Sequence, residues 1–206
     1  DGMIVGAQWV DGINGMGLAF DGASHVAIPA SETTDDIQNG FTYMIWLMPT
    51  GDQPNDNTRV MERDWHNPAI QIGPADFYGS IAVNADQAST NVRGGAWAMN
   101  EWSFVVLTYD GAMIHLYVDG EMVNEIEVGV PDATSNAGAE FAVWLGSWKA
   151  DGWNYVGVLD EAAIFNVALS EDDIVDIMLN GLEGGTSAVS PMDKLATTWS
   201  GVKTSR

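Results

Sequence analysis

The sequence predicts an all-β fold, a sandwich of antiparallel sheets with one short helix near the C-terminal end. Residues 41–48 and 102–109 are rich in aromatic and β-branched side chains and are apolar on both faces, which is typical of central strands. Two Asp-Gly pairs, at 110–111 and 119–120, separate short apolar runs, as in β-hairpins. A single clear stretch, residues 171–178, repeats apolar side chains at helical spacing.

The strands follow from alternating or continuous apolar runs bounded by turn residues. Because Asp-Gly supplies the positive φ values of a type I′ turn, we expect residues 102–109, 113–118 and the segment from Met122 to form an antiparallel meander. The further expected strands are residues 17–20, 25–28, 41–48, 69–72, 81–83, 140–145 and 156–165.

The expected helix has clear start and stop signals. Ser170 is an N-cap residue and Asp173 occupies the third helical position, an aspartate variant of the capping box. Ile174 and Ile177 then mark an apolar face, and Gly181 stands where a helix ends. We expect this helix to pack on an edge of the sandwich.

The chain length of 206 residues suits one large all-β domain, which we place at residues 1–184, followed by a linker or tail at 185–206. The absence of cysteine excludes disulfides and thiol catalysis. No apolar run reaches the length of a membrane span. Since the chain opens with Asp1-Gly2 and no basic-then-apolar leader precedes them, we expect a mature chain or an excised fragment.

The charge balance is strongly acidic: 7 Lys and Arg stand against 29 Asp and Glu, a formal net charge of −22. Such a surface repels nucleic acid and anionic lipid, so we expect neither as a partner. The carboxylates are scattered among apolar residues. They are consistent with a solvated, salt-adapted surface, with a few carboxylates that ligate a hard cation such as calcium, or with both.

Several motifs occur in an order that resembles a known family. Residues 17–22 with 25–29, residues 41–49, the two Asp-Gly hairpins and residues 157–170 resemble the laminin G-like (LamG) domains of the concanavalin A-like lectin/glucanase superfamily, of the bacterial secreted type. The resemblance implies a jelly roll of two curved antiparallel sheets and a monomeric binding module of a secreted or cell-surface protein. The family's early W-x-F-D strand is absent. Either the fragment lacks it, or the region 195–199 takes its place.

The same resemblance implies a structural calcium ion. In this sequence the matching positions are Asp21, the carbonyl of Gly22, and Asp160. Carboxylate and carbonyl oxygens are the ligands that calcium takes, typically about six to eight of them. The alternative is that Asp21 makes an Asx turn and Asp160 pairs across strands.

Two loop-like segments, residues 63–68 and 147–154, mix tryptophan with Asp, Asn and His. An indole ring can stack on the apolar face of a sugar while polar groups take its hydroxyls, so these loops predict a glycan site. The alternative is that the tryptophans cap the open ends of the sandwich. The predicted ligand-binding residues are Asp64, Trp65, His66, Asn67, Trp148, Asp151, Trp153 and Asn154.

We do not expect an enzyme. Glycosidases of the laminarinase type on this fold carry a strand with the pattern E-x-D-x-x-E, whereas Glu62 and Asp64 are followed by Asn67 in place of the second glutamate. Glu125 and Glu127 share a strand face but have no third acid. The leading hypothesis is therefore a calcium-stabilised glycan-binding module. The alternatives are an adhesive domain that contacts protein, and a divergent glycosidase with two carboxylates about 5 Å apart.

Overall fold

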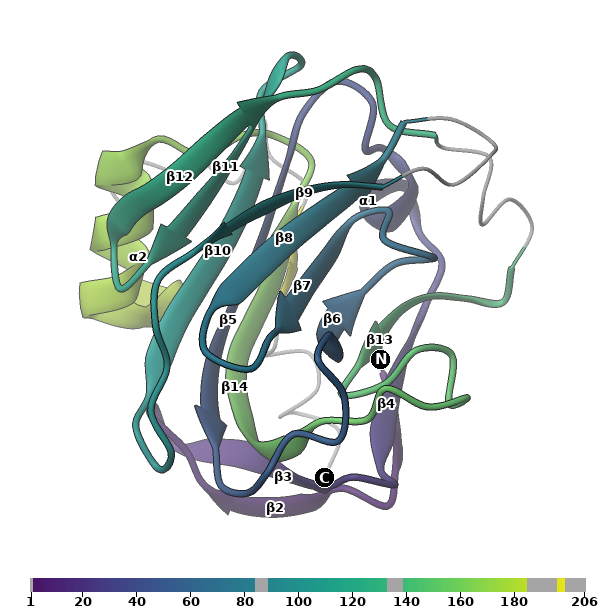
Figure 1. The fold of residues 1–206 in the computed structure, drawn as a ribbon, viewed down its shortest axis with the longest axis vertical. Coiled ribbons are helices and arrows are strands. Elements are labelled where there is room, and N and C mark those ends of the chain that lie inside the picture. The colour runs from purple at the N-terminus through teal and green to yellow at the C-terminus, as the bar shows by residue number, and fades with distance from the viewer. Residues whose placement is uncertain (1, 84–88, 133–138, 185–195, 199–206) are drawn as a thin grey trace.

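The computed structural model describes residues 2–83, 89–132, 139–184 and 196–198, which form a sandwich of two antiparallel sheets (Figure 1). In spatial order the seven-stranded sheet consists of β1 (Met3–Val5), β4 (His25–Pro29), β13 (Phe141–Leu145), β6 (Thr58–Glu62), β7 (Ala69–Ile72), β8 (Phe77–Ala82) and β9 (Ser89–Gly94). The eight-stranded sheet consists of β12 (Glu121–Glu127), β11 (Met113–Val118), β10 (Ser103–Tyr109), β5 (Phe41–Pro49), β14 (Val156–Phe165), β3 (Met16–Asp21) and β2 (Gln8–Asp11), with β15 (Ala196–Thr198) paired to β14. The predicted all-β jelly roll is confirmed.

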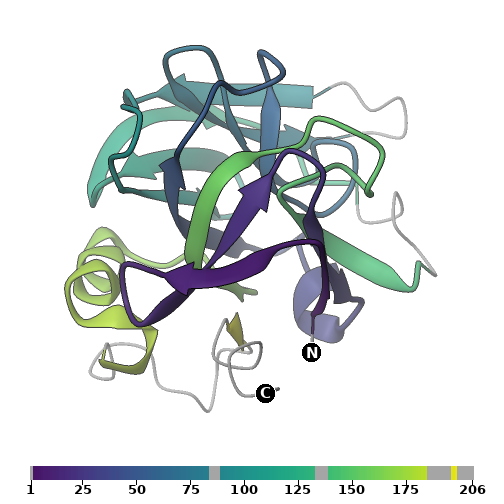
Figure 2. The same ribbon diagram turned by 90° about the horizontal axis from the view of Figure 1, so that it is seen from below.

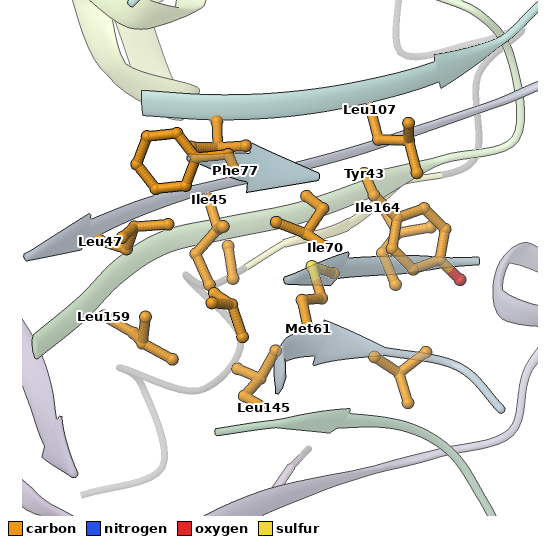
Figure 3. Close-up of a cluster of buried hydrophobic side chains, with 14 of the residues drawn as sticks. Tyr43, Ile45, Leu47, Met61, Ile70, Phe77, Leu107, Leu145, Leu159 and Ile164 are labelled. Carbon is orange, nitrogen blue, oxygen red and sulfur yellow. The ribbon is translucent and has the colours of Figure 1, made fainter. Parts of the chain in front are cut away.

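The hydrophobic core lies between the two sheets. Alternate side chains of each strand point inward, so Ile70 on β7 and Leu107 on β10 meet in one fully buried cluster. Figure 3 shows this layer, with Ile45, Leu47 and Leu159 contributed by β5 and β14. Burying an aliphatic side chain of this size is worth about 1.5–3 kcal/mol, so this layer is the main source of stability.

Helix α2 (Glu171–Gly184) covers the outer face of the eight-stranded sheet. Its Ile174 and Ile177 pack in a second buried cluster with Phe104 and other side chains that point away from the main core. The predicted capping box is present: the Ser170 hydroxyl accepts a hydrogen bond from Asp173 N, and the Asp173 carboxylate accepts one from Ser170 N. Figure 2 shows α2 on the opposite side of the molecule from β8 and β9, whose outer face carries no helix.

One of the two predicted type I′ turns is present and the other prediction is wrong. Asp119 and Gly120, between β11 and β12, both have positive φ, 52° and 85°, as that turn requires. Asp110 does not adopt positive φ; instead its carboxylate accepts hydrogen bonds from the backbone of Ala112 and Met113. The side chain of Asp110 therefore shapes this hairpin as an Asx-type turn.

The structure also contains elements that the sequence analysis did not predict. These are the short helix α1 (Glu32–Asp35) and the strands β1, β2, β6 and β9. Strand β15 pairs with residues 163–165 of β14, beyond the stretch of β14 that pairs with β3. Part of the region 195–199 therefore adds a strand to the sheet, while residues 185–195 and 199 lie outside the described part of the chain.

Candidate functional site

The two loops predicted to bind a ligand meet at one end of the sandwich. The ring of Trp65, after β6, lies 5.3 Å from that of Trp148, and Trp148 lies 5.5 Å from Trp153, both edge to face and measured between centroids. An ion pair joins the same loops, with Lys149 Nζ 2.5 Å from Asp64 Oδ1. Trp65, Trp148 and Trp153 therefore form one unit, here called the tryptophan cluster.

The backbone of both loops is held in an uncommon conformation. The left-handed φ values of non-glycine residues in these loops are 55° at His66, 50° at Lys149, 61° at Ala150 and 51° at Trp153. Each such residue costs about 1–3 kcal/mol and persists only where its surroundings hold it in that conformation, and such residues cluster at functional sites. Backbone hydrogen bonds supply part of that support, from Trp148 N to Gly152 O at 3.1 Å and from residue 151 N to Trp148 O at 2.8 Å.

A hollow of about 350 Å³ opens beside Trp153. Its walls combine one indole ring, two side-chain amides, a proline ring and two glycines; they are Gly22, Pro54, Asn55, Gly152, Trp153 and Asn154. Asn154 Nδ2 donates a hydrogen bond to Gly22 O at 2.8 Å, which fixes one wall to the turn after β3. The volume lies near the lower end of the range of small-molecule sites, about 300–1,000 Å³.

Arg59, on β6, anchors Trp153 from within the protein. Its side chain is completely buried, and its guanidinium carbon lies 5.7 Å from the Trp153 ring centroid, a cation–π contact. Arg59 N also donates a hydrogen bond to Trp153 O at 2.8 Å. The guanidinium is neutralised by Glu62, with 2.7 Å between Nε and Oε2, and it donates a further hydrogen bond to Gln71 Oε1.

The Arg59 contacts continue as a row of polar side chains on β6 to β9, which is buried from Arg59 to Ser80 and ends at the exposed Asn91. Gln71 Nε2 donates to Ser80 Oγ at 2.5 Å, and Ser80 Oγ donates to Asn91 Oδ1 at 2.6 Å. His66 joins the row from the loop, with Nδ1 3.1 Å from Gln71 Nε2 and Nε2 3.3 Å from Arg59 Nη2. Buried polar side chains that satisfy one another fix a single arrangement. This row therefore holds Arg59 in place, and Arg59 contacts Trp153; the row is here called the floor of the site.

Two titratable groups in this floor have shifted pKa values. Burial raises the pKa of Glu62 to about 7, against the opposing effect of the Arg59 charge. Burial, together with the Arg59 charge, lowers the pKa of His66 to about 4. The contacts of His66 agree with this direction, because both ring nitrogens face nitrogen donors. A neutral ring can accept a hydrogen bond at one of these contacts, whereas an imidazolium ion would place an N–H against a donor at both. His66 is therefore neutral at pH 7.

The predicted ligand-binding residues divide into three groups. Trp153 and Asn154 line the hollow. Asp64, His66 and Asn67 are instead buried, at 3%, 8% and 0% exposure, and they support the loops from beneath. Asn67 Nδ2, for example, donates to the carbonyl of residue 132, on a distant segment. The remaining residues are the half-buried Trp65 and Trp148 of the cluster, and the exposed Asp151 at the tip of its loop.

The structure does not bring Asp21 and Asp160 together, so the predicted three-residue calcium site is not formed. Asp21 pairs with Val156, four residues along β14 from Asp160, a separation of about 13 Å at the rise of a β-strand. Asp21 Oδ1 accepts hydrogen bonds from Ala23 N and Ser24 N, the Asx turn that was the alternative reading. These backbone hydrogen bonds lower the pKa of the Asp21 carboxyl. Within the described ranges no three acidic, histidine or cysteine side chains gather as a metal site.

The two carboxylates of the incomplete glycosidase pattern, Glu62 and Asp64, both form ion pairs within the protein. Glu62 is buried, with Oε1 accepting from His66 N at 2.8 Å and Oε2 paired with Arg59. Asp64 is buried against Lys149. A retaining glycosidase needs two carboxyl groups about 5–5.5 Å apart that face a sugar, and these two carboxylates face cations of their own chain.

Arg59, Glu62 and Gln71 belong to the site but are not among the residues predicted for it. The signal that could have found them is a charged or amide side chain inside short, otherwise apolar strands, since such groups are buried only with partners. Pro54 and Asn55 were not predicted either, because they reach the hollow only through the folded path of the chain after β5.

A jelly-roll sandwich with a tryptophan-lined hollow at one end places the protein in the class of concanavalin A-like domains. Residues 20–175 match the laminin G-type family described as the concanavalin A-like lectin/glucanases superfamily, and the chain belongs to this superfamily. The resemblance inferred from the motifs is confirmed.

Similar proteins come from several sources. Human pappalysin-1 is 24% identical over 182 residues, which cover 81% of this chain and 11% of that protein. Domain 4 of AbnA, a GH43 extracellular arabinanase of Geobacillus stearothermophilus solved in complex with arabinotriose, has a TM-score of 0.65 at 18% identity, covering 86% of this chain and 87% of that chain. The botulinum neurotoxin serotype G binding domain has a TM-score of 0.67 at 9% identity, covering 87% and 46%. These structures share the fold. This chain spans only a small part of pappalysin-1.

Proposed function

We propose that this chain is a non-catalytic carbohydrate-binding module that holds a glycan in the hollow beside Trp153. The observation that carries the proposal is the composition of the hollow, in which an indole ring stands beside the amides of Asn55 and Asn154. An aromatic ring offers an apolar surface to the C–H face of a sugar, and amides both donate and accept hydrogen bonds to its hydroxyls. The arabinotriose complex of AbnA domain 4 supports the same reading of this fold.

The location and the metal are part of the proposal. A secreted or cell-surface location is supported by the family and by the extracellular arabinanase. No helix among the described residues is long and apolar enough to cross a membrane. Calcium stays a prediction of the resemblance: of its expected ligands, Asp160 is buried and accepts a hydrogen bond from Asn14 N at 3.1 Å, so any site there would not include Asp21.

One observation favours a second candidate, an adhesive domain that binds protein. Strand β12 lies at the edge of the eight-stranded sheet, and all its side chains are exposed, including Met122, Val123 and Ile126. Exposed edge strands can pair with a strand of another protein. A related fold binds protein: the botulinum neurotoxin DC binding domain was solved with rat synaptotagmin II.

A glycan array followed by calorimetry tests the leading proposal. The variant Trp153→Asn removes the ring, and asparagine tolerates the left-handed φ of 51° at this position better than most residues. We expect the affinity for a glycan found on the array to fall at least about tenfold, or about 1.4 kcal/mol. Leu179→Ala, on the exposed surface of α2, is the control and should bind as the wild type does. Unchanged binding by Trp153→Asn would place the glycan elsewhere.

A further inference from the structure

We infer that the hollow beside Trp153 selects uncharged glycans and rejects anionic ones such as uronic acids and sulfated sugars. This inference rests on the proposed function and deepens it. Six residues line the hollow, two of them glycines, and all six are uncharged. Nothing in its walls therefore offers a cation to a carboxylate or sulfate group.

The surroundings of the hollow are acidic. Each of its three wall segments is flanked in the chain by exposed aspartate: Asp21 precedes Gly22, Asp52 and Asp56 lie on either side of the 54–55 segment, and Asp151 precedes Gly152. All four carboxylates are exposed to the solvent through which a ligand approaches. With a net charge of −22 on the whole chain, the local potential repels an approaching anion.

The basic side chains that could offset this charge are already committed. All four lysine and arginine residues in the described part of the chain are in ion pairs, and these pairs are Arg59–Glu62, Arg63–Asp35, Arg93–Asp76 and Lys149–Asp64. The two nearest to the tryptophan cluster are Arg59, which is completely buried, and Lys149, which is tied to a buried aspartate. Recognition of an anionic sugar normally uses a free arginine or lysine, and neither of these two can turn to the hollow without breaking its pair.

A matched glycan array tests the inference. Neutral oligosaccharides, with arabinotriose among them, are printed beside carboxylated and sulfated ones, including trigalacturonate and its uncharged methyl ester. Binding is measured once with calcium present and once with chelator, because only the second condition prevents a divalent cation from bridging carboxylates. A blank array counts only if it is blank in both conditions. We expect the bound glycans to be neutral, with any anionic counterpart at least about tenfold weaker at low salt. This gap should narrow at 0.5 M salt, because the Debye length falls from about 10 Å at 0.1 M towards about 3 Å at 1 M.

Charge variants assign the selectivity to the rim of the hollow. Asp52→Asn/Asp56→Asn should raise the ratio of anionic to neutral binding severalfold. Glu121→Gln/Glu127→Gln, on the distant exposed strand β12, removes the same charge and should leave the ratio unchanged. Equal or stronger binding of the anionic glycans by the wild type would overturn the selectivity while leaving the glycan site standing. A blank array would overturn the glycan site itself, and an equal effect of both double variants would assign the selectivity to net charge and not to the rim.

Discussion

Replacing His66 with asparagine should expose two opposing pH dependences in the floor of the site. His66 and Glu62 are both buried beside Arg59, and their pKa values are shifted in opposite ways. Asparagine removes the titrating ring, and it tolerates the φ of 55° at this position. The reciprocal variant, Glu62→Gln, removes the other titrating group.

The signs follow from proton binding in the folded and unfolded states. The pKa of His66 is lowered from 6.5 to about 4, so its contribution to stability is complete above pH 6.5 and is lost as pH falls towards 4. The pKa of Glu62 is raised from 4.5 to about 7, so its contribution is complete below pH 4.5 and is lost as pH rises through 7. Between pH 4.5 and 6.5 the two slopes oppose each other, and the wild type shows only their difference.

The magnitude is set by the shifts. Because one pKa unit corresponds to about 1.4 kcal/mol, the cited values give a change between pH 8 and pH 5 of about 2 kcal/mol for His66 and about 2–3 kcal/mol for Glu62, with opposite signs. The free energy of unfolding is measured by urea titration, followed by tryptophan fluorescence, at constant ionic strength. The range ends at pH 5 because solubility falls near the pI of about 4.1.

The differences between wild type and variants isolate each group from the other carboxylates. The stability of the wild type relative to His66→Asn should fall by about 2 kcal/mol from pH 8 to pH 5, whereas relative to Glu62→Gln it should rise. A His66→Asn difference that stays flat within about 0.5 kcal/mol would refute the neutral, buried state of this histidine.

Two further predictions concern the core and the turn after β3. Gly79→Ala should destabilise the fold by about 1–3 kcal/mol in urea titration, because the new Cβ would lie 2.2 Å from Leu107 Cδ1; Gly129→Ala, whose Cβ meets no atom closer than 3.7 Å, is the control and should stay within about 0.5 kcal/mol. Asp21→Asn should leave any calcium-dependent shift in Tm unchanged at matched ionic strength, since strand register keeps Asp21 away from Asp160; a shift abolished by this variant would contradict that register.

Much of the fold could be predicted because its signals are local. The central strands β5 and β10 are apolar on both faces, since one face meets the core and the other meets α2 and its neighbours. The capping box of Ser170 and Asp173 is likewise a short-range pattern. Strands such as β6 were not predicted because they carry charged side chains. Those side chains can be buried only because they pair with each other and with Gln71 on the neighbouring strand.

The candidate site was predictable in composition and less so in arrangement. Aromatic and polar residues marked the two loops as candidates, and the structure brings these loops together, as the contact of Trp65 with Trp148 shows. Which of those residues line the hollow depends on the tertiary path, so the burial of His66 and Asn67 could not be read from their types. The expectation that Asp21 and Asp160 lie together was wrong for the same reason, because strand register cannot be read from the type of either residue.

The position of β14 has a consequence for how the protein is made on the ribosome. This strand lies between β5 and β3, both complete by residue 49, yet it begins only at Val156. At about 5–20 residues per second, synthesis takes roughly 5–20 s to reach Val156 from the end of β5. During this time the edges of β3 and β5 that later pair with β14 are unpaired. Until this late strand is made, the facing edges of β3 and β5 stay open to pairing with another chain. A nascent chain stalled before Val156 would lack the strand that unites the two halves of the sheet.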